Sequence, residues 1–112
     1  MTLSEEKING VITLEISGKI HAEASEELLK KLNTLIDQGE RHLLLDLSGV
    51  ECINSSGLRA LLAAAKNLND LSGKMVLTDV NEFIHQVLHV SGLTSHIAVY
   101  PSKGKALKAL NG

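Results

Sequence analysis

Four small residues in the middle of the chain, Asn54, Ser55, Ser56 and Gly57, have residue types and a spacing that could support chemistry. They follow an apolar run, residues 43–47, and precede a long segment rich in leucine and alanine. A strand followed closely by a helix would place them at a helix N-terminus, where backbone N–H groups are free and the helix dipole favours negative charge. A hydroxyl there can cap the helix or carry a phosphoryl group, and the residue types alone leave both roles open.

Within this segment, either Asn54 or Ser55 could accept a hydrogen bond from a backbone N–H two or three residues further on, and so cap the helix. Gly57 is harder to explain, because glycine in a helix costs up to ~1 kcal/mol relative to alanine. One explanation is that the missing side chain exposes the start of the helix to the backbone of a partner.

Other residue types that often carry catalysis are present without a suitable spacing. Cys52 has no pattern typical of a nucleophile, and we interpret it as a small buried side chain. His85 and His89 could share a helix face, but two ligands without a nearby third favour a solvated surface over a metal site. Asp46 has no second carboxylate near it, so we interpret it as a strand-end residue that loop amides satisfy. The glycine-rich loops typical of nucleotide binding are absent from the sequence. We therefore expect no enzyme activity, no metal and no cofactor.

The elements that precede residues 54–57 are indicated by a turn and by apolar periodicity. An Asn9-Gly10 turn between residues 7–8 and 11–16 predicts a β-hairpin. Alternation over residues 11–16 predicts one buried strand face, and Ser17 and Gly18 are expected to end the strand. Residues 18–22 are expected to form a loop and residues 23–37 a helix that Gly39 ends.

From residue 43 onward, strands and helices alternate. Residues 43–47 are predicted to form a central strand covered on both faces. Helices are predicted over residues 55–71, after Asn81 and after Ser102, and strands over residues 74–78 and 97–100. The expected buried stripes are Leu58, Leu61, Leu62, Ala65 and Leu68 in the first of these helices, and Phe83, Ile84, Val87 and Leu88 in the second. The order β-β-α-β-α-β-α-β-α predicts an α/β fold with a mixed sheet of four to five strands and about four helices.

Composition limits the classes of partner and the compartment. The chain has 112 residues, which fits a single domain over residues 1–112. Aromatic residues make up only 2%, and the formal net charge is -2 without a basic block, so we expect no nucleic acid partner. No apolar run approaches the ~20 residues of a membrane span, so we expect no membrane insertion. A single cysteine and the lack of a signal-peptide pattern indicate a cytoplasmic protein.

Nearly the whole chain resembles the STAS domains of the anti-sigma-factor antagonist family. Residues 45–50, Leu-Asp-Leu-Ser-Gly-Val, and residues 53–58, Ile-Asn-Ser-Ser-Gly-Leu, are similar to the family's strand, short link and Asp-Ser-Ser-Gly-Leu motif before a long helix. Residues 18–20 resemble the loop before the family's first helix, and residues 90–93 resemble its Gly-Leu after the third helix. The resemblance implies the STAS fold.

The same resemblance implies a bacterial signalling switch that regulates transcription by partner switching. Stand-alone members bind an anti-sigma factor, usually a serine kinase with a histidine-kinase-like ATPase fold, and are released when that kinase phosphorylates the serine after the motif's Asp. A serine phosphatase restores the unphosphorylated form. Carried onto this chain, the phosphoacceptor is Ser55, with Ser56 as the alternative, in a monomer or weak dimer. The partner-binding residues would be His21, Asn54, Ser55, Ser56, Gly57 and Leu58.

Two positions depart from the family pattern, and both fall near the surface where the family meets its kinase. Asn54 stands in place of the usual Asp, and His21 stands where the early loop often carries an acid. An alternative function is that of a STAS subunit that regulates without phosphorylation, such as the small cytoplasmic partner of a lipid-exporting ABC transporter. The hydroxyls of the motif would then contact the transporter's ATPase.

Overall fold

The structure is a computed structural model that describes residues 1–111. Five strands form one mixed sheet in the order β1-β2-β3-β4-β5, in which β1 and β2 are antiparallel and the other neighbours are parallel. This arrangement confirms the predicted α/β fold and adds one short 3₁₀ helix, η1. The elements in chain order are β1 (Thr2–Ile8), β2 (Val11–Ile20), α1 (Ala22–Asp37), β3 (His42–Ile53), α2 (Ser55–Asp70), β4 (Lys74–Thr78), α3 (Glu82–Val90), η1 (Leu93–Ser95), β5 (Ala98–Tyr100) and α4 (Lys103–Asn111).

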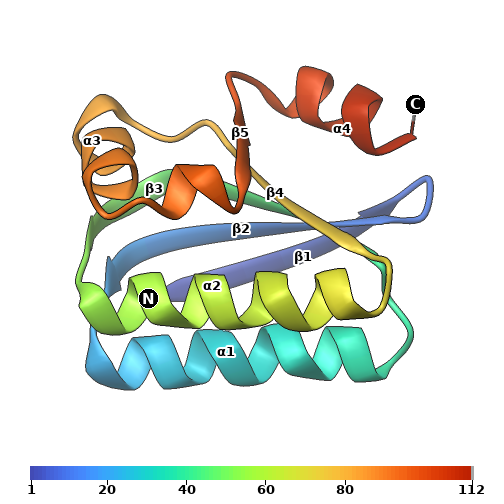
Figure 1. Cartoon of the computed structure of the whole chain (residues 1–112), viewed down its shortest axis with the longest axis horizontal. Coiled ribbons are helices and arrows are strands. Elements are labelled where there is room, and N and C mark those ends of the chain that lie inside the picture. The colour runs from blue at the N-terminus through green and yellow to red at the C-terminus, as the bar shows by residue number, and fades with distance from the viewer. Residues whose placement is uncertain (112) are drawn as a thin grey trace.

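Helices cover both faces of the sheet. Helices α1 and α2 run side by side along one face, and α4 lies on the opposite side (Figure 1). The main core lies beneath α1 and α2, while Val11, Leu44 and Val76 form a smaller cluster with Ala106 and Leu110 of α4. The expectation of one buried face in residues 11–16 is therefore wrong, because α4 covers the second face where β2 begins. In the described residues, no helix is both long and apolar enough to cross a bilayer.

The two strands that lead to the motif are longer than expected. β2 continues to Ile20 instead of ending at Ser17 and Gly18, so the predicted loop over residues 18–22 is wrong. The strand stays paired with β3 through two register shifts, between Glu15 and Ser17 and between Gly18 and Lys19. Gly18 has a φ of +95°, a left-handed backbone that glycine tolerates without strain. β3 likewise extends to Ile53, which brings the ends of both strands next to the start of α2.

Helix α2 is rotated relative to the predicted stripe. Leu61 and Leu68 are buried as expected, but Leu62 is 38% exposed and Leu58 is half-buried. The buried side of α2 consists of Gly57, Ala60, Leu61, Ala64 and Leu68. The small residues Ala60 and Ala64 allow α2 to approach α1 closely while its leucines reach the sheet.

Helix α3 presents apolar residues to both the core and the solvent. Ile84 and Leu88 are fully buried, as predicted. Phe83, which was expected to face inward, is 62% exposed, and Val87 is half-buried. Apolar residues at positions 83, 84, 87 and 88 occupy two adjacent stripes of one helix, and only one of these stripes can reach the sheet.

Candidate functional site

The start of α2 is capped by Asn54. Its backbone is extended, with φ -102° and ψ -175°, and its side-chain oxygen accepts a hydrogen bond from the backbone N–H of Gly57 at 3.2 Å. Its carbonyl oxygen also accepts from the N–H of Leu58 at 3.0 Å. Of the two capping residues that the sequence allows, the structure selects Asn54, which leaves the hydroxyl of Ser55 free of that task.

Ser55 is the first residue of α2, and its side chain is exposed. Among residues 1–111 its hydroxyl makes no hydrogen bond, and the backbone N–H groups of Ser55 and Ser56 have no acceptor. An anion attached to Ser55 would therefore lie near free N–H donors and the positive end of the helix dipole. Ser56 is half-buried and lines a shallow groove between α1 and α2, so it is the less accessible of the two serines.

A cation that the sequence analysis did not single out lies one helical turn beyond the motif. Arg59 is exposed, lines the same groove as Ser55 and forms no ion pair in the part of the chain that the structure describes. The spacing of four residues was the available signal, because residues at i and i+4 are neighbours on a helix surface.

Gly57 is required by packing inside the domain. A Cβ atom built at this position would lie 2.6 Å from Cγ1 of Ile53, 2.9 Å from Cγ2 of Ile20 and 3.0 Å from the carbonyl oxygen of Ile20. The explanation that Gly57 exposes the helix to a partner's backbone is therefore wrong, because the close neighbours are the chain's own strands β2 and β3. Gly57 is therefore a buried packing residue beneath the start of α2 and is not part of the exposed surface of the site.

The end of β2 brings His21 to the same edge of the sheet as the motif. The backbone N–H of Asn54 donates to the carbonyl of Ile20 at 3.2 Å, which ties the start of α2 to β2. His21 is the next residue, and Nε2 of its exposed ring lies 3.2 Å from Sγ of Cys52. The interpretation of Cys52 as a buried side chain is wrong, because Cys52 lies near the end of β3, is half-buried and reaches His21. The structure thus places His21 beside the predicted motif residues.

Two grooves extend from the motif toward α3. The first has a volume of about 290 Å³ and joins Ser55 and Leu58 to Leu62 and Ser91. The second has a volume of about 420 Å³ and lies between Leu58 and the outer side of α3. Leu58 and Ser91 line both grooves, so the surface beside Ser55 continues onto α3. Leu58 was expected at a partner-binding surface, whereas Phe83 and Val87 of α3 were expected in the core.

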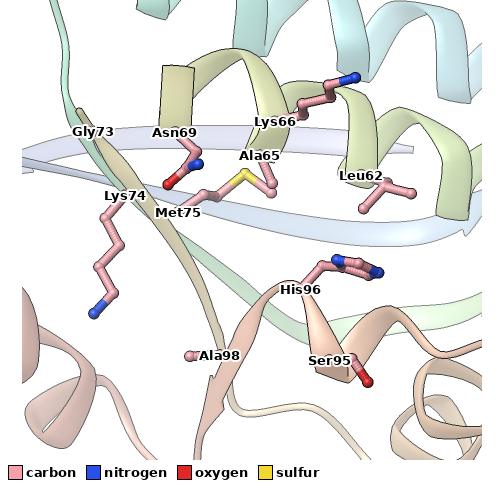
Figure 2. Close-up of a pocket in the computed structure, with 10 residues that line it drawn as sticks. All are labelled: Leu62, Ala65, Lys66, Asn69, Gly73, Lys74, Met75, Ser95, His96 and Ala98. Atoms are coloured by element: carbon pink, nitrogen blue, oxygen red, sulfur yellow. The ribbon is translucent and has the colours of Figure 1, made fainter. Parts of the chain in front are cut away.

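A larger cavity of about 710 Å³ lies further along α2 and faces η1 and β5 (Figure 2). Leu62, Ala65 and Met75 supply apolar surface, and its only titratable residues are Lys66, Lys74 and His96. Carboxylate and thiol side chains are absent from its lining, so no acidic side chain accompanies His96 and Ser95 there.

The other candidate groups lie away from the motif. His85 and His89 are exposed on α3, and within residues 1–111 no group of three or more His, Cys, Asp or Glu side chains could hold a metal ion. The exposure of both histidines confirms the interpretation of a solvated helix face.

Asp46 is buried beneath α4 and forms part of a structural ion pair. Its carboxylate accepts a hydrogen bond from the backbone N–H of Ser48 at 2.9 Å and lies 3.3 Å from Nζ of Lys103. Burial opposes ionisation of Asp46, but the hydrogen bonds from Ser48 and the charge of Lys103 outweigh it, so the pKa of Asp46 is below its usual value. The prediction of a strand-end residue that loop amides satisfy is wrong in its location, because a backbone amide does bind the carboxylate but Asp46 and Ser48 both lie within β3.

Comparison with known proteins agrees with this geometry. The STAS domain profile matches residues 3–106. BtrV of Bordetella bronchiseptica, assigned by its name to the anti-sigma factor antagonists, is 33% identical over 109 residues, covering 97% of this chain and 94% of BtrV. The anti-sigma F factor antagonist of Paenibacillus polymyxa is 28% identical over 111 residues, covering 98% and 95% of the two chains.

A solved structure shows the same fold. The crystal structure of an anti-sigma factor antagonist from Mycobacterium paratuberculosis superimposes with a TM-score of 0.89 at 26% identity, covering 99% of this chain and 94% of that one. The sheet order, the capped start of α2 and the family match over residues 3–106 lead to one assignment. The chain belongs to the STAS domain family.

Proposed function

We propose that this protein is an anti-sigma factor antagonist that binds an anti-sigma factor while Ser55 is unmodified and is released when Ser55 is phosphorylated. The observation that carries this proposal is the exposed hydroxyl of Ser55 at the first position of α2, with the cap supplied by its neighbour Asn54. Relatives that are similar over nearly their whole length are named anti-sigma factor antagonists. The output of such a switch is the regulation of transcription.

The position of Ser55 explains how one modification could change binding without changing the fold. A phosphoserine adds about -1.5 to -2 charges and three acceptor oxygens. The free N–H groups of Ser55 and Ser56 and the dipole of α2 would tolerate this charge within the domain. In an interface, the same group would introduce bulk and a charge that must be desolvated. A loss of ~2–4 kcal/mol would weaken binding by roughly 30- to 1,000-fold, which is enough for a switch.

The proposed partners follow from this role. The anti-sigma factor would be a serine kinase with a histidine-kinase-like ATPase fold, and a separate serine phosphatase would regenerate the binding form. The partner-facing residues would be His21, Asn54, Ser55, Ser56 and Leu58, all of which lie at one end of the sheet. Gly57 contributes by allowing α2 to sit closely on Ile20 and Ile53.

Phosphorylation can be tested by incubating the protein with ATP and a candidate anti-sigma factor kinase from the same organism, followed by intact-mass measurement and peptide mapping. We expect one added phosphate, located on Ser55. Ser55→Ala should abolish the modification and Ser56→Ala should retain it. A phosphate on Ser56 would reassign the acceptor, and an unmodified wild-type protein would refute the phosphorylation switch.

The effect on binding is tested separately with Ser55→Asp. This variant should bind the kinase at least 30-fold more weakly than wild type, while its circular dichroism and melting temperature stay close to wild type. If Ser55→Asp unfolds the protein, the hydroxyl has a structural role and the proposed switch loses its support. Binding to the ATPase of a transporter, independent of phosphorylation, would instead favour the alternative of a transporter subunit.

A further inference from the structure

Helix α3 carries an outer apolar stripe that the fold itself does not use. Ile84 and Leu88 bury the inner side of the helix completely. On the outer side, Phe83 is 62% exposed and Val90 is 85% exposed, with the half-buried Val87 between them. Positions 83, 87 and 90 follow the spacing i, i+4, i+7, which places their side chains along one side of the helix. Phe83 is the only phenylalanine in the chain.

This stripe is continuous with the surface around Ser55. Phe83, Val87 and Val90 line a groove together with Leu58 of α2. Leu58 also lines the adjoining groove that contains Ser55. We define Leu58, Phe83, Val87 and Val90 as the α3 strip. The remaining residues of its groove, Gln86 and Ser91, are uncharged, so the strip offers an apolar surface without a charge in its lining.

The position of α3 is fixed before any partner binds. The side-chain oxygen of Asn81 accepts from the backbone N–H of Ile84 at 2.9 Å and so caps α3. The amide nitrogen of the same side chain donates to the carbonyl of Val50 at 3.1 Å, which ties the helix to β3. Together with the buried Ile84 and Leu88, these bonds hold the outer stripe in one orientation. A surface that is already ordered loses less conformational entropy when it binds.

From this continuity we infer that the α3 strip is the apolar part of the surface that docks the anti-sigma factor, and that the partner presents uncharged apolar side chains to it. The inference rests on the proposed function. Two parts of the interface would then have different roles. The α3 strip supplies affinity through apolar burial, and Ser55, at the edge of the same surface, supplies the phosphorylation-dependent release. A phosphate on Ser55 would lie at the edge of the apolar contact between the α3 strip and the partner, where removing water from its charge is costly.

The test uses the full chain and the purified anti-sigma factor kinase that phosphorylates Ser55, with affinities measured by isothermal titration calorimetry. The double variant Phe83→Ser/Val90→Ser removes two exposed side chains, so its melting temperature should remain close to that of wild type. We expect its affinity to fall at least 30-fold. Leu71→Ser is the matched control, since Leu71 is 48% exposed but follows the C-terminal end of α2. Its affinity should match wild type within twofold.

A second variant keeps the test decisive if the double variant is poorly folded. Gln86→Lys adds a charge within the groove and removes no apolar side chain, and it should also weaken binding at least tenfold. If wild type binds and Ser55→Asp is released, but the strip variants bind like wild type, the inference is overturned and the proposed function stands. If wild type does not bind the kinase at all, the proposed function fails and the inference fails with it.

A second copy of this chain is the other possible occupant of the strip. Sedimentation velocity of wild type and of Phe83→Ser/Val90→Ser over the same micromolar concentrations shows whether a second copy occupies the strip. We expect the two proteins to sediment alike. A wild-type dimer that the double variant abolishes would make the strip a self-association surface and would overturn the inference.

Discussion

The side-chain oxygen of Asn54 lies 3.2 Å from the backbone nitrogen of Gly57, so the residue before Ser55 caps helix α2. Capping and modification are thus assigned to different side chains. This division allows the hydroxyl of Ser55 to gain a phosphate without removing the hydrogen bond that starts the helix. It also gives Asn54 a structural role that does not depend on the negative charge usual at this position of the family.

The role of Asn54 can be tested by comparing two substitutions. Asn54→Ala removes the cap and should lower the free energy of unfolding by ~1 kcal/mol in urea denaturation. Asn54→Asp keeps an acceptor oxygen and adds a charge that the helix dipole favours, so the unmodified protein should be at least as stable as wild type. Asn69→Ala is the control, because Asn69 is exposed on α2 and its change should stay within ~0.5 kcal/mol. Equal losses in Asn54→Ala and Asn69→Ala would contradict the capping role.

Arg59 is expected to interact with a phosphate on Ser55 across one turn of α2. An anion placed four residues before a cation is the favourable order on a helix. Arg59→Gln should therefore raise the second pKa of the phosphoserine, whose ordinary value is about 6, because the cation favours the dianion. A ³¹P NMR titration of the phosphorylated protein measures this shift. Lys66→Gln, further along the same helix, should titrate like wild type, and overlapping curves for all three proteins would exclude the interaction.

The elements of this fold are predictable from sequence because the signals that define them are local. The Asn9-Gly10 turn, the alternating strand of residues 11–16 and the capping residues Asn54 and Asn81 each act within a few positions of the chain. The exposed residues at the start of α2, Asn54 and Ser55, are predictable from sequence for the same reason.

The errors arise where the determining contact comes from a distant part of the chain. Gly57 is constrained by Ile20, which belongs to β2 and lies far away in sequence. The outward orientation of Phe83 depends on which of two apolar stripes of α3 meets the sheet, and periodicity alone cannot decide this. The partner of Asp46 is Lys103 at the start of α4, a pairing that only the folded sheet creates.

The packing of Gly57 predicts a strong effect of one added methyl group. Gly57→Ala would place a Cβ atom 2.6 Å from Cγ1 of Ile53, and we expect a loss of ~1–3 kcal/mol in the free energy of unfolding. Gly104→Ala is a matched control in α4, where the nearest atom to a new Cβ is Oγ of Ser102 at 4.0 Å. There the higher helix propensity of alanine should stabilise the protein by ~0.5–1 kcal/mol. Urea denaturation of both variants measures the difference, and a stabilised Gly57→Ala would contradict the packing seen in the structure.

The ion pair between Asp46 and Lys103 predicts how stability changes in acid. The pKa of Asp46 is lowered in the folded state, so its carboxylate stabilises the fold above the ordinary Asp value of about 3.9. That contribution is lost as the pH falls from the ordinary value through the lowered value, because in this range the unfolded chain binds the proton more readily than the folded protein does. The pKa of Lys103 is raised, chiefly by its hydrogen bond to Glu15, so Lys103 stays charged throughout this range.

Asp46→Asn removes the titrating carboxyl, so the free energy of unfolding of the variant should fall less steeply as the pH is lowered. Urea denaturation between pH 2 and pH 6 should show wild type more stable than the variant near pH 6, with the difference shrinking as the pH falls below about 4. Glu51→Gln provides the control, because Glu51 is exposed on β3 and forms no ion pair among the described residues. Its difference from wild type should vary much less with pH. A difference between wild type and Asp46→Asn that stays constant from pH 6 to pH 2 would show that the carboxylate does not stabilise α4 through its charge.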